Sequence, residues 1–210
     1  MMFSDRVEAG KRLAEALDHL DGEEVVVLGV PRGGVEVAAE VAAQHGWPLD
    51  IVVPRKVGAP FNPELGLGAI APGVRVLDER MLRTLGVSEE YLEDEISKQE
   101  EEIRRRTEAY RRGKAPVELS GKTVVIVDDG IATGGTAIAA VRWAKAQGAK
   151  RVIPAVPVAP REAVAKLSKE ADEVVALAIP EPFFAVGQWY GDFPQVSDRQ
   201  VVELLDRAPR

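Results

Sequence analysis

Two adjacent acids and a glycine-rich turn form the most chemically informative segment of the chain. Asp128 and Asp129 follow the apolar run 124–127, and the sequence Ala-Thr-Gly-Gly-Thr at 132–136 opens the next helical pattern. Ligands of open parallel sheets bind at the carboxyl ends of strands, where we expect this segment to lie. A cradle for a phosphate-sized dianion then comes from the N–H groups and two hydroxyls of Ala132, Thr133, Gly134, Gly135 and Thr136.

The two acids need a different partner, because neighbouring carboxylates repel a phosphate. Asp128 and Asp129 are suited to accept hydrogen bonds from sugar hydroxyls or to hold a hydrated Mg²⁺. A sugar phosphate satisfies both halves of the segment. The alternative is that the acids merely end a strand and that Thr-Gly-Gly-Thr merely begins a helix.

Three other motifs with phosphate or acid chemistry do not fit. A P-loop NTPase needs Gly-x-x-x-x-Gly-Lys-Ser/Thr, but Pro116 occupies the first glycine position of the segment that ends in Gly121-Lys122-Thr123. A dinucleotide fold needs Gly-x-Gly-x-x-Gly after a strand, which neither Gly29 nor Gly66-Leu67-Gly68 supplies. A receiver-type regulator carries its acid pair on the first strand, without this cradle.

Residues 124–136 resemble the phosphoribosyl-diphosphate signature of type I phosphoribosyltransferases, and the ending is most similar to the adenine branch. The resemblance implies that Asp128 and Asp129 hold the ribose 2′- and 3′-hydroxyls of phosphoribosyl diphosphate (PRPP) and that 132–136 wrap its 5′-phosphate. It implies Mg²⁺ as cofactor, bridged by the substrate and reached through water by either acid, with no direct protein ligand. Ala132 replaces the aspartate of hypoxanthine-guanine enzymes, which disfavours those bases and leaves the acceptor open.

The resemblance also requires a second anion site for pyrophosphate. Arg32 offers a planar fork of donors, and Gly33 and Gly34 expose N–H groups at the start of a helix. Members of the family often have a cis bond in this loop, which would fall between Arg32 and Gly33 here. Arg55 and Lys56, which follow the next strand, are expected to place two more cations at the same edge of the sheet; the alternative is that they are solvated.

Two further segments are expected to cover the site. The excursion 58–73 occupies the place of the family's mobile lid, and Glu64 within it is a candidate to stabilise a cationic ribosyl centre. The hood segment 180–196 is rich in aromatic residues, of which Phe184 and Trp189 are expected to stack on the base. The alternative for such rings is a small core within the hood.

Alternating apolar and helical patterns place these residues on an α/β framework, a mainly parallel twisted sheet flanked by helices in a single domain, 1–210. Expected strands cover 24–30, 49–53, 123–127, 151–156 and 173–177, and Ser4 and Ser197 are expected to cap the first and last helices. A helical insertion at 79–115 contains a long helix, 88–112. One face of this helix carries regularly spaced apolar residues, here called its seam. The seam packs on its own domain or, alternatively, forms a homodimer contact.

Composition limits the function classes. The 210 residues carry 27 basic and 34 acidic side chains, a net charge of −7 that opposes binding to nucleic acid or an anionic membrane. The absence of cysteine excludes thiolate chemistry, and only two histidines are present. Without an apolar run of spanning length, the expected location is the cytoplasm.

The sequence therefore predicts an enzyme that transfers ribose 5-phosphate from PRPP to a nitrogenous base with release of pyrophosphate. Arg32, Lys56, Asp128 and Asp129 are its expected catalytic residues, acting by positioning and charge stabilisation. Two alternatives remain: a PRPP or nucleotide sensor that acts through a protein partner, and a sugar-phosphate hydrolase.

Overall fold

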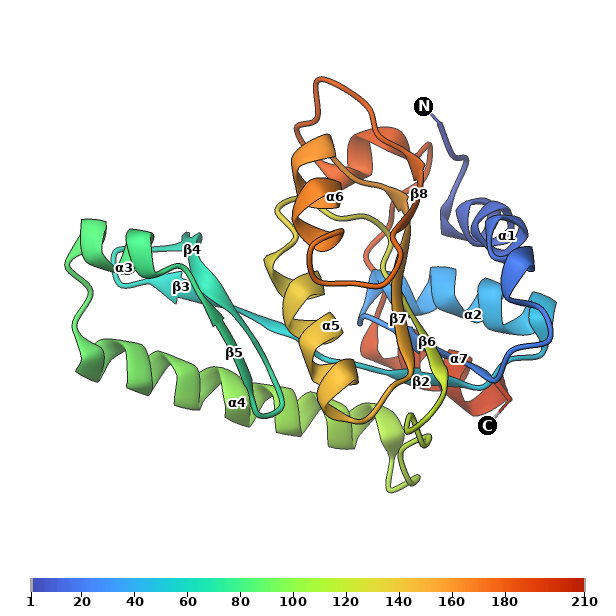
Figure 1. Cartoon of the computed structure of the whole chain (residues 1–210), viewed down its shortest axis with the longest axis horizontal. Coiled ribbons are helices and arrows are strands. Elements are labelled where there is room, and N and C mark those ends of the chain that lie inside the picture. Colours follow the sequence, from blue (N-terminus) through green and yellow to red (C-terminus); the bar gives the residue numbers. More distant parts are fainter. Residues whose placement is uncertain (1, 210) are drawn as a thin grey trace.

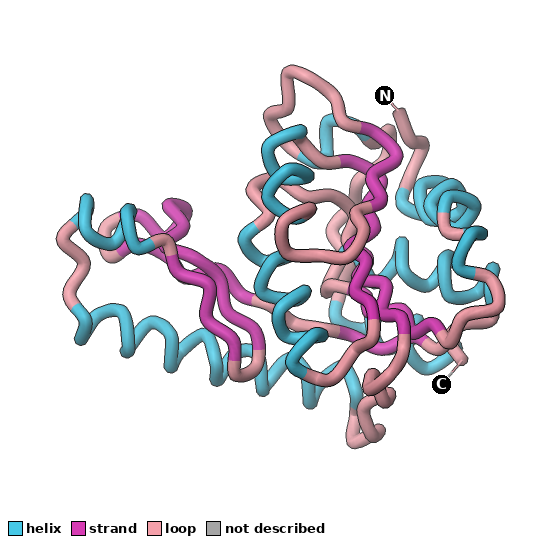
Figure 2. The backbone as a smooth tube through the Cα atoms, in the orientation of Figure 1, coloured by secondary structure: helices cyan, strands magenta, loops and turns pink. Residues whose placement is uncertain are grey.

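Five parallel strands form the main sheet of the computed structural model, which describes residues 2–209. They are β1 (Val25–Gly29), β2 (Leu49–Ile51), β6 (Thr123–Val127), β7 (Arg151–Val158) and β8 (Val175–Ala178), in the spatial order β2-β1-β6-β7-β8 (Figures 1 and 2). This arrangement confirms the predicted α/β fold. It also brings the loops after β1 and β6 together, because these strands are neighbours.

Helices cover both faces of this sheet, which explains why its strands are mainly apolar, with Asp50 and Thr123 as buried polar exceptions. On one face, Val27 and Val125 pack with α1 (Arg6–Ala16), α2 (Gly33–His45) and α7 (Asp198–Arg207). On the other, Val26 and Ile126 pack with α5 (Gly135–Ala146) and α6 (Arg161–Leu167). The sheet is therefore a rigid support for the loops at its carboxyl edge.

The first helix begins one residue later than predicted. Asp5, not Ser4, is its N-cap, and the Asp5 carboxylate accepts the Glu8 N–H at 2.8 Å. The Ser4 N–H instead donates to the Glu8 side chain. Both residues are good caps, so composition alone does not choose between them. The predicted Ser197 cap is confirmed.

The segment after β2, which includes the excursion 58–73, is a second sheet. It is antiparallel and consists of β3 (Arg55–Ala59), β4 (Asn62–Ala71) and β5 (Val74–Leu77), in that order. Pro72 and Gly73 form the two-residue connection between β4 and β5, and Gly73 has a φ of +70°. Pro60, Pro72 and Gly73 lie in the turns of this sheet, whereas Gly58, Pro63, Gly66 and Gly68 lie within its strands.

The predicted insertion contains two helices, α3 (Glu79–Leu85) and α4 (Glu89–Arg111). With the second sheet they form a lobe beside the main sheet (Figure 1). The seam of α4 faces inward: Ile96, Ile103 and Tyr110 are buried in the same core as the main sheet. The internal reading of the seam is therefore confirmed.

A short 3₁₀ helix, η2 (Val186–Trp189), lies within the predicted hood segment, next to the start of the chain. Phe3 forms a β-bridge with Tyr190, and the two rings lie 5.5 Å apart. Among residues 2–209, no helix has the length and apolarity needed to cross a bilayer.

Candidate functional site

The glycine-rich turn lies between β6 and α5, as predicted. Gly134 is the N-cap of α5 with a φ of +88°, a left-handed conformation that favours glycine. Within the described chain, the N–H groups of Thr133, Gly134, Gly135 and Thr136 have no hydrogen-bond acceptor. Free N–H groups at the start of a helix attract an anion, so the turn has the chemistry of a phosphate cradle.

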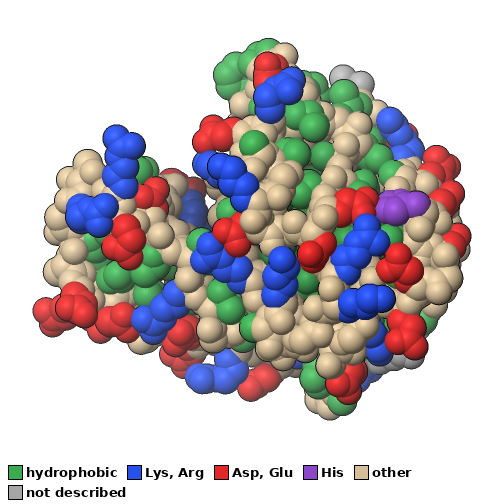
Figure 3. All heavy atoms as spheres, viewed as in Figure 1, with side chains coloured by type: hydrophobic (Ala, Val, Ile, Leu, Met, Phe, Trp, Pro, Cys, Tyr) green, Lys and Arg blue, Asp and Glu red, His purple; other side chains and the backbone are tan. Residues whose placement is uncertain are grey.

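This turn opens onto a cleft of about 1110 Å³ between the main sheet and the lobe. Figure 3 shows a hollow between these two parts of the molecule. One wall carries Asp128 and residues 130–136. The opposite wall comes from β3, β4, β5 and α3 and carries Lys56, Glu64, Arg80 and Arg83.

The two acids pack tightly against the start of α2. A Cβ atom on Gly33 would lie 2.0 Å from Asp129 Oδ2, and one on Gly34 would lie 2.7 Å from Asp128 Cα. Only glycine fits at both positions. The positive end of α2 therefore faces the carboxylates and offsets part of their charge.

The acids differ in their surroundings. Asp129 Oδ2 accepts a hydrogen bond from Arg6 Nε at 2.8 Å, and its backbone oxygen accepts the Tyr190 hydroxyl at 2.5 Å. Asp128 lines the cleft and accepts the Asp129 N–H at 2.8 Å. Burial, followed by the charge of Asp129, raises the pKa of the Asp128 carboxyl well above its usual range.

Comparison with known proteins identifies the family. A family model described as the phosphoribosyl transferase domain matches residues 5–188. The chain belongs to the phosphoribosyltransferase family. It is 51% identical over 210 residues to a Mycobacterium tuberculosis protein whose provisional name is phosphoribosyl transferase, and it spans 47% of the length of that relative.

The chain is also similar to solved structures. The protein TT1426 from Thermus thermophilus is 48% identical, with full coverage of both chains and a TM-score of 0.85. The AQ2163 protein from Aquifex aeolicus is 16% identical, with a TM-score of 0.54 over 98% of this chain and 88% of that chain, a likeness of fold alone.

The predicted cations of this phosphoribosyltransferase-family chain occupy three separate places. Lys56 lines the cleft, where Nζ lies 3.2 Å from Glu64 Oε2. Arg55 points to α4 and donates from Nε to Gln99 Oε1 at 2.9 Å. The expectation that both cations extend toward one edge is wrong for Arg55, because neighbouring residues of a strand face opposite sides.

Arg32 lies at the start of α2, near the C-terminal helix. Its guanidinium Nη1 is 3.8 Å from Asp198 Oδ1, and Asp198 also accepts the Tyr110 hydroxyl at 2.7 Å. In the described chain, Arg32 is not among the residues that line the cleft. A cis peptide bond lies between Pro31 and Arg32, one bond before the place that the resemblance implies, between Arg32 and Gly33.

The two aromatic residues predicted to stack on a base are placed differently. Trp189 packs in a small core with Phe183, whose ring centroid is 6.2 Å away. Its indole N–H is buried and has no acceptor among the described residues. Phe184 is 81% exposed. Neither residue lines the cleft of the described chain, so Trp189 follows the alternative of a hood core, and stacking by Phe184 stays a prediction.

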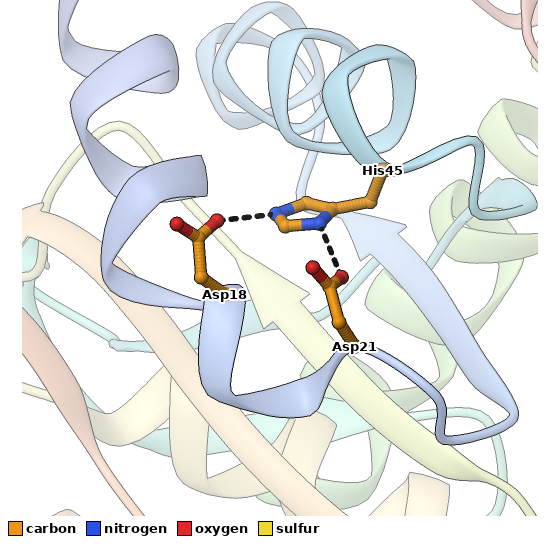
Figure 4. Close-up of side chains that lie close together, drawn as sticks. All are labelled: Asp18, Asp21 and His45. Atoms are coloured by element: carbon orange, nitrogen blue, oxygen red, sulfur yellow. Dashed lines mark hydrogen bonds and ion pairs between the residues drawn. The ribbon is translucent and has the colours of Figure 1, made fainter.

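A cluster of Asp18, Asp21 and His45 lies at the opposite end of α2 (Figure 4). The helix α2 has 13 residues, so at 1.5 Å per residue its two ends lie about 18 Å apart, and the cluster is at the end far from Gly33 and Gly34. His45 Nδ1 lies 2.8 Å from Asp21 Oδ1, and Nε2 lies 3.0 Å from the Ala14 carbonyl oxygen. Because both ring nitrogens face protein oxygens, the cluster links the ends of α1 and α2.

Sequence reasoning missed Arg6 and Tyr190 as parts of the site. Their partner is Asp129, which lies 123 positions from Arg6 and 61 from Tyr190. Neither residue belongs to a local motif. An arginine in the first turn of a helix, otherwise a place for acids, is a weak signal that points to a partner elsewhere.

Proposed function

We propose that the protein transfers ribose 5-phosphate from PRPP to a nitrogen heterocycle, a nucleobase, with release of pyrophosphate. The observation that carries this proposal is the turn at 132–136, whose unpaired N–H groups open onto the cleft beside Asp128. One anion cradle next to one sugar-binding acid matches the two ends of a ribose 5-phosphate group. Membership of the phosphoribosyltransferase family supports the same reaction class.

Each proposed role follows from the chemistry of the side chain. Residues 132–136 bind the 5′-phosphate, and Asp128 accepts a hydrogen bond from the ribose. Lys56 and Arg32 neutralise the departing pyrophosphate. Their present partners, Glu64 and Asp198, do not prevent this, because exposed ion pairs contribute only about 0–1 kcal/mol.

The residues present fit a magnesium ion held mainly by the substrate. Asp128 offers a carboxylate in the cleft, whereas the Asp129 side chain is hydrogen-bonded to Arg6. When bound with PRPP, Mg²⁺ would offset the charge of the pyrophosphate. We propose that Asp128 reaches this ion through water.

The acceptor is not a 6-oxopurine in this proposal, because Ala132 provides no carboxylate for the ring proton. Ala132, Ile131 and Val186 line the cleft at its hood end and offer an apolar surface for a planar base. A cytoplasmic location and a homodimer stay predictions.

The test separates the enzyme from its two alternatives. Calorimetry with PRPP and Mg²⁺ measures binding, and pyrophosphate release is then followed with each member of a base panel. The proposal expects binding, and release that depends on one base. Binding without release for any base indicates a sensor, and release without a base indicates a hydrolase.

No specific observation favours the sensor. Its expected contact, the long helix, already uses Ile96, Ile103 and Tyr110 inside its own domain.

A change of Thr133 to Val, which removes a hydroxyl from the cradle, is expected to weaken PRPP binding about tenfold, the loss of a hydrogen bond to a charged group. Unchanged affinity would contradict the proposed phosphate site.

A further inference from the structure

We propose that Arg6 gives the two adjacent acids, Asp128 and Asp129, different roles. Arg6 is a positioning residue that holds Asp129 in the protein framework, and Asp128 is then the single carboxylate that contacts the ribose hydroxyls. This inference rests on the proposed function and assigns the sugar-binding role to one acid instead of two.

Arg6 is deeply buried, and its surroundings leave it little freedom. Its side chain is 6% exposed, Nε donates to Asp129 Oδ2 at 2.8 Å, and Nη1 donates to the Pro194 carbonyl at 2.7 Å. Its guanidinium carbon lies 3.8 Å from the centre of the Phe193 ring. Arg6 therefore joins α1, the hood and the turn after β6.

Asp129 has further close neighbours, although its side chain is 17% exposed. Its Oδ2 atom occupies the space beside Gly33 where a Cβ would lie at only 2.0 Å. Its backbone oxygen accepts the hydroxyl of Tyr190, a residue that is 5% exposed. Asp129 is not among the residues that line the cleft of the described chain.

Glu36 is the other acid near Arg6, but its Oε2 atom lies 3.8 Å from Nη1 and is too distant for a hydrogen bond. Asp129 is thus the carboxylate that the guanidinium holds. A planar guanidinium that donates in two directions fixes position better than a point charge does.

Asp128 shows the opposite arrangement. It lines the cleft, and no arginine or lysine lies in ion-pair contact with it in the described chain. One of its oxygens accepts the Asp129 N–H, which orients the carboxyl group and leaves the other oxygen for a ligand. The side chains of two consecutive residues therefore have different partners.

The experiment compares four variants: Asp128→Asn, Asp129→Asn, Arg6→Gln and the control Arg12→Gln. Arg12 lies on the same helix, but it is 45% exposed and pairs with Glu8 on the surface. Each variant is measured for thermal unfolding and for binding of PRPP and of ribose 5-phosphate by calorimetry. A double variant, Arg6→Gln with Asp129→Asn, measures the coupling between the two residues.

We expect Asp128→Asn to weaken both ligands at least about tenfold without lowering the melting temperature, since it removes a charged acceptor from the ligand. Asp129→Asn and Arg6→Gln should each lower the melting temperature by roughly 6–20 °C, the effect of breaking a buried pair, and change affinity less than about threefold. The double variant should be little worse than the poorer single one. Arg12→Gln should resemble the unaltered protein.

Equal loss of affinity in Asp128→Asn and Asp129→Asn, with unchanged melting temperatures, would overturn the inference. So would an Arg6→Gln variant that behaves like Arg12→Gln. If the unaltered protein binds neither PRPP nor ribose 5-phosphate, the proposed function and the ligand half of the inference both fail. The coupling between Arg6 and Asp129 in thermal unfolding then tests by itself whether Arg6 holds Asp129 in the protein framework.

Discussion

Replacement of Gly34 by alanine tests whether the loop after β1 and the acid turn form one packed unit. The added Cβ would lie 2.7 Å from Asp128 Cα and 2.8 Å from the Val127 carbonyl oxygen. Both atoms are backbone, so no side chain can rotate away. Overpacking of this kind costs about 1–3 kcal/mol, and the upper half of that range is expected here. Alanine in a helix returns about 0.5–1 kcal/mol relative to glycine.

The net loss is therefore about 2 kcal/mol, which corresponds to a fall of about 4–8 °C in the melting temperature of a chain this size. Gly135→Ala is the matched control for stability, because its Cβ would meet only Ala69 Cβ at 3.9 Å, an ordinary contact. That variant should melt at or slightly above the temperature of the unaltered protein. The measurement is calorimetric unfolding at one pH. Equal melting temperatures for the two variants would refute the close packing of these loops.

Four variants test the charges. Because burial raises the pKa of Asp128, the folded state holds the carboxyl proton more tightly than the unfolded state does. Asp128 therefore lowers the stability of the folded state as pH rises through the raised pKa. In thermal scans across pH, Asp128→Asn should melt higher than the unaltered protein at neutral pH and at the same temperature below pH 3.8. Lys56→Ala should weaken PRPP binding in calorimetry with little change in melting temperature. Arg55→Gln should lower the melting temperature and leave PRPP binding unchanged. The reverse pattern would contradict the assignment of Lys56 to the cleft. Arg111→Ala should cost about 3–5 kcal/mol in urea unfolding, because it leaves the 1%-exposed Asp50 carboxylate without its ion pair; a loss under 1 kcal/mol would contradict a buried pair.

Local patterns in the sequence were sufficient to predict the main sheet and the cradle. The inner strands β1 and β6 are buried on both faces and appear as apolar runs, and β6 begins and ends at the predicted residues, Thr123 and Val127. The turn at Gly134 has a local signal too, since it combines a strand end, a glycine-rich stretch and a helix start. Both features depend on neighbours in the chain.

The second sheet was less predictable because its signals conflict. Gly58, Gly66 and Gly68 interrupt the alternation that identifies a strand, and the pairing of β3 with β4 shifts register near Gly58. A Cβ at Gly68 would lie 2.2 Å from the Val76 carbonyl oxygen of β5. The glycines permit close approach between strands, a role that a single sequence does not distinguish from that of a loop.

The supports of the site depend on contacts between distant parts of the chain. Arg6 and Tyr190 lie near opposite ends of the sequence, yet both hold Asp129. The long helix α4 is fixed in a similar way, with Tyr91 bonded to the Gly58 carbonyl near its start and Arg111 paired with Asp50 at its end. A lobe anchored at both ends keeps the Lys56 wall of the cleft opposite the cradle. A local motif thus specifies the chemistry of the turn, and long-range contacts specify which of its two acids remains available to a ligand.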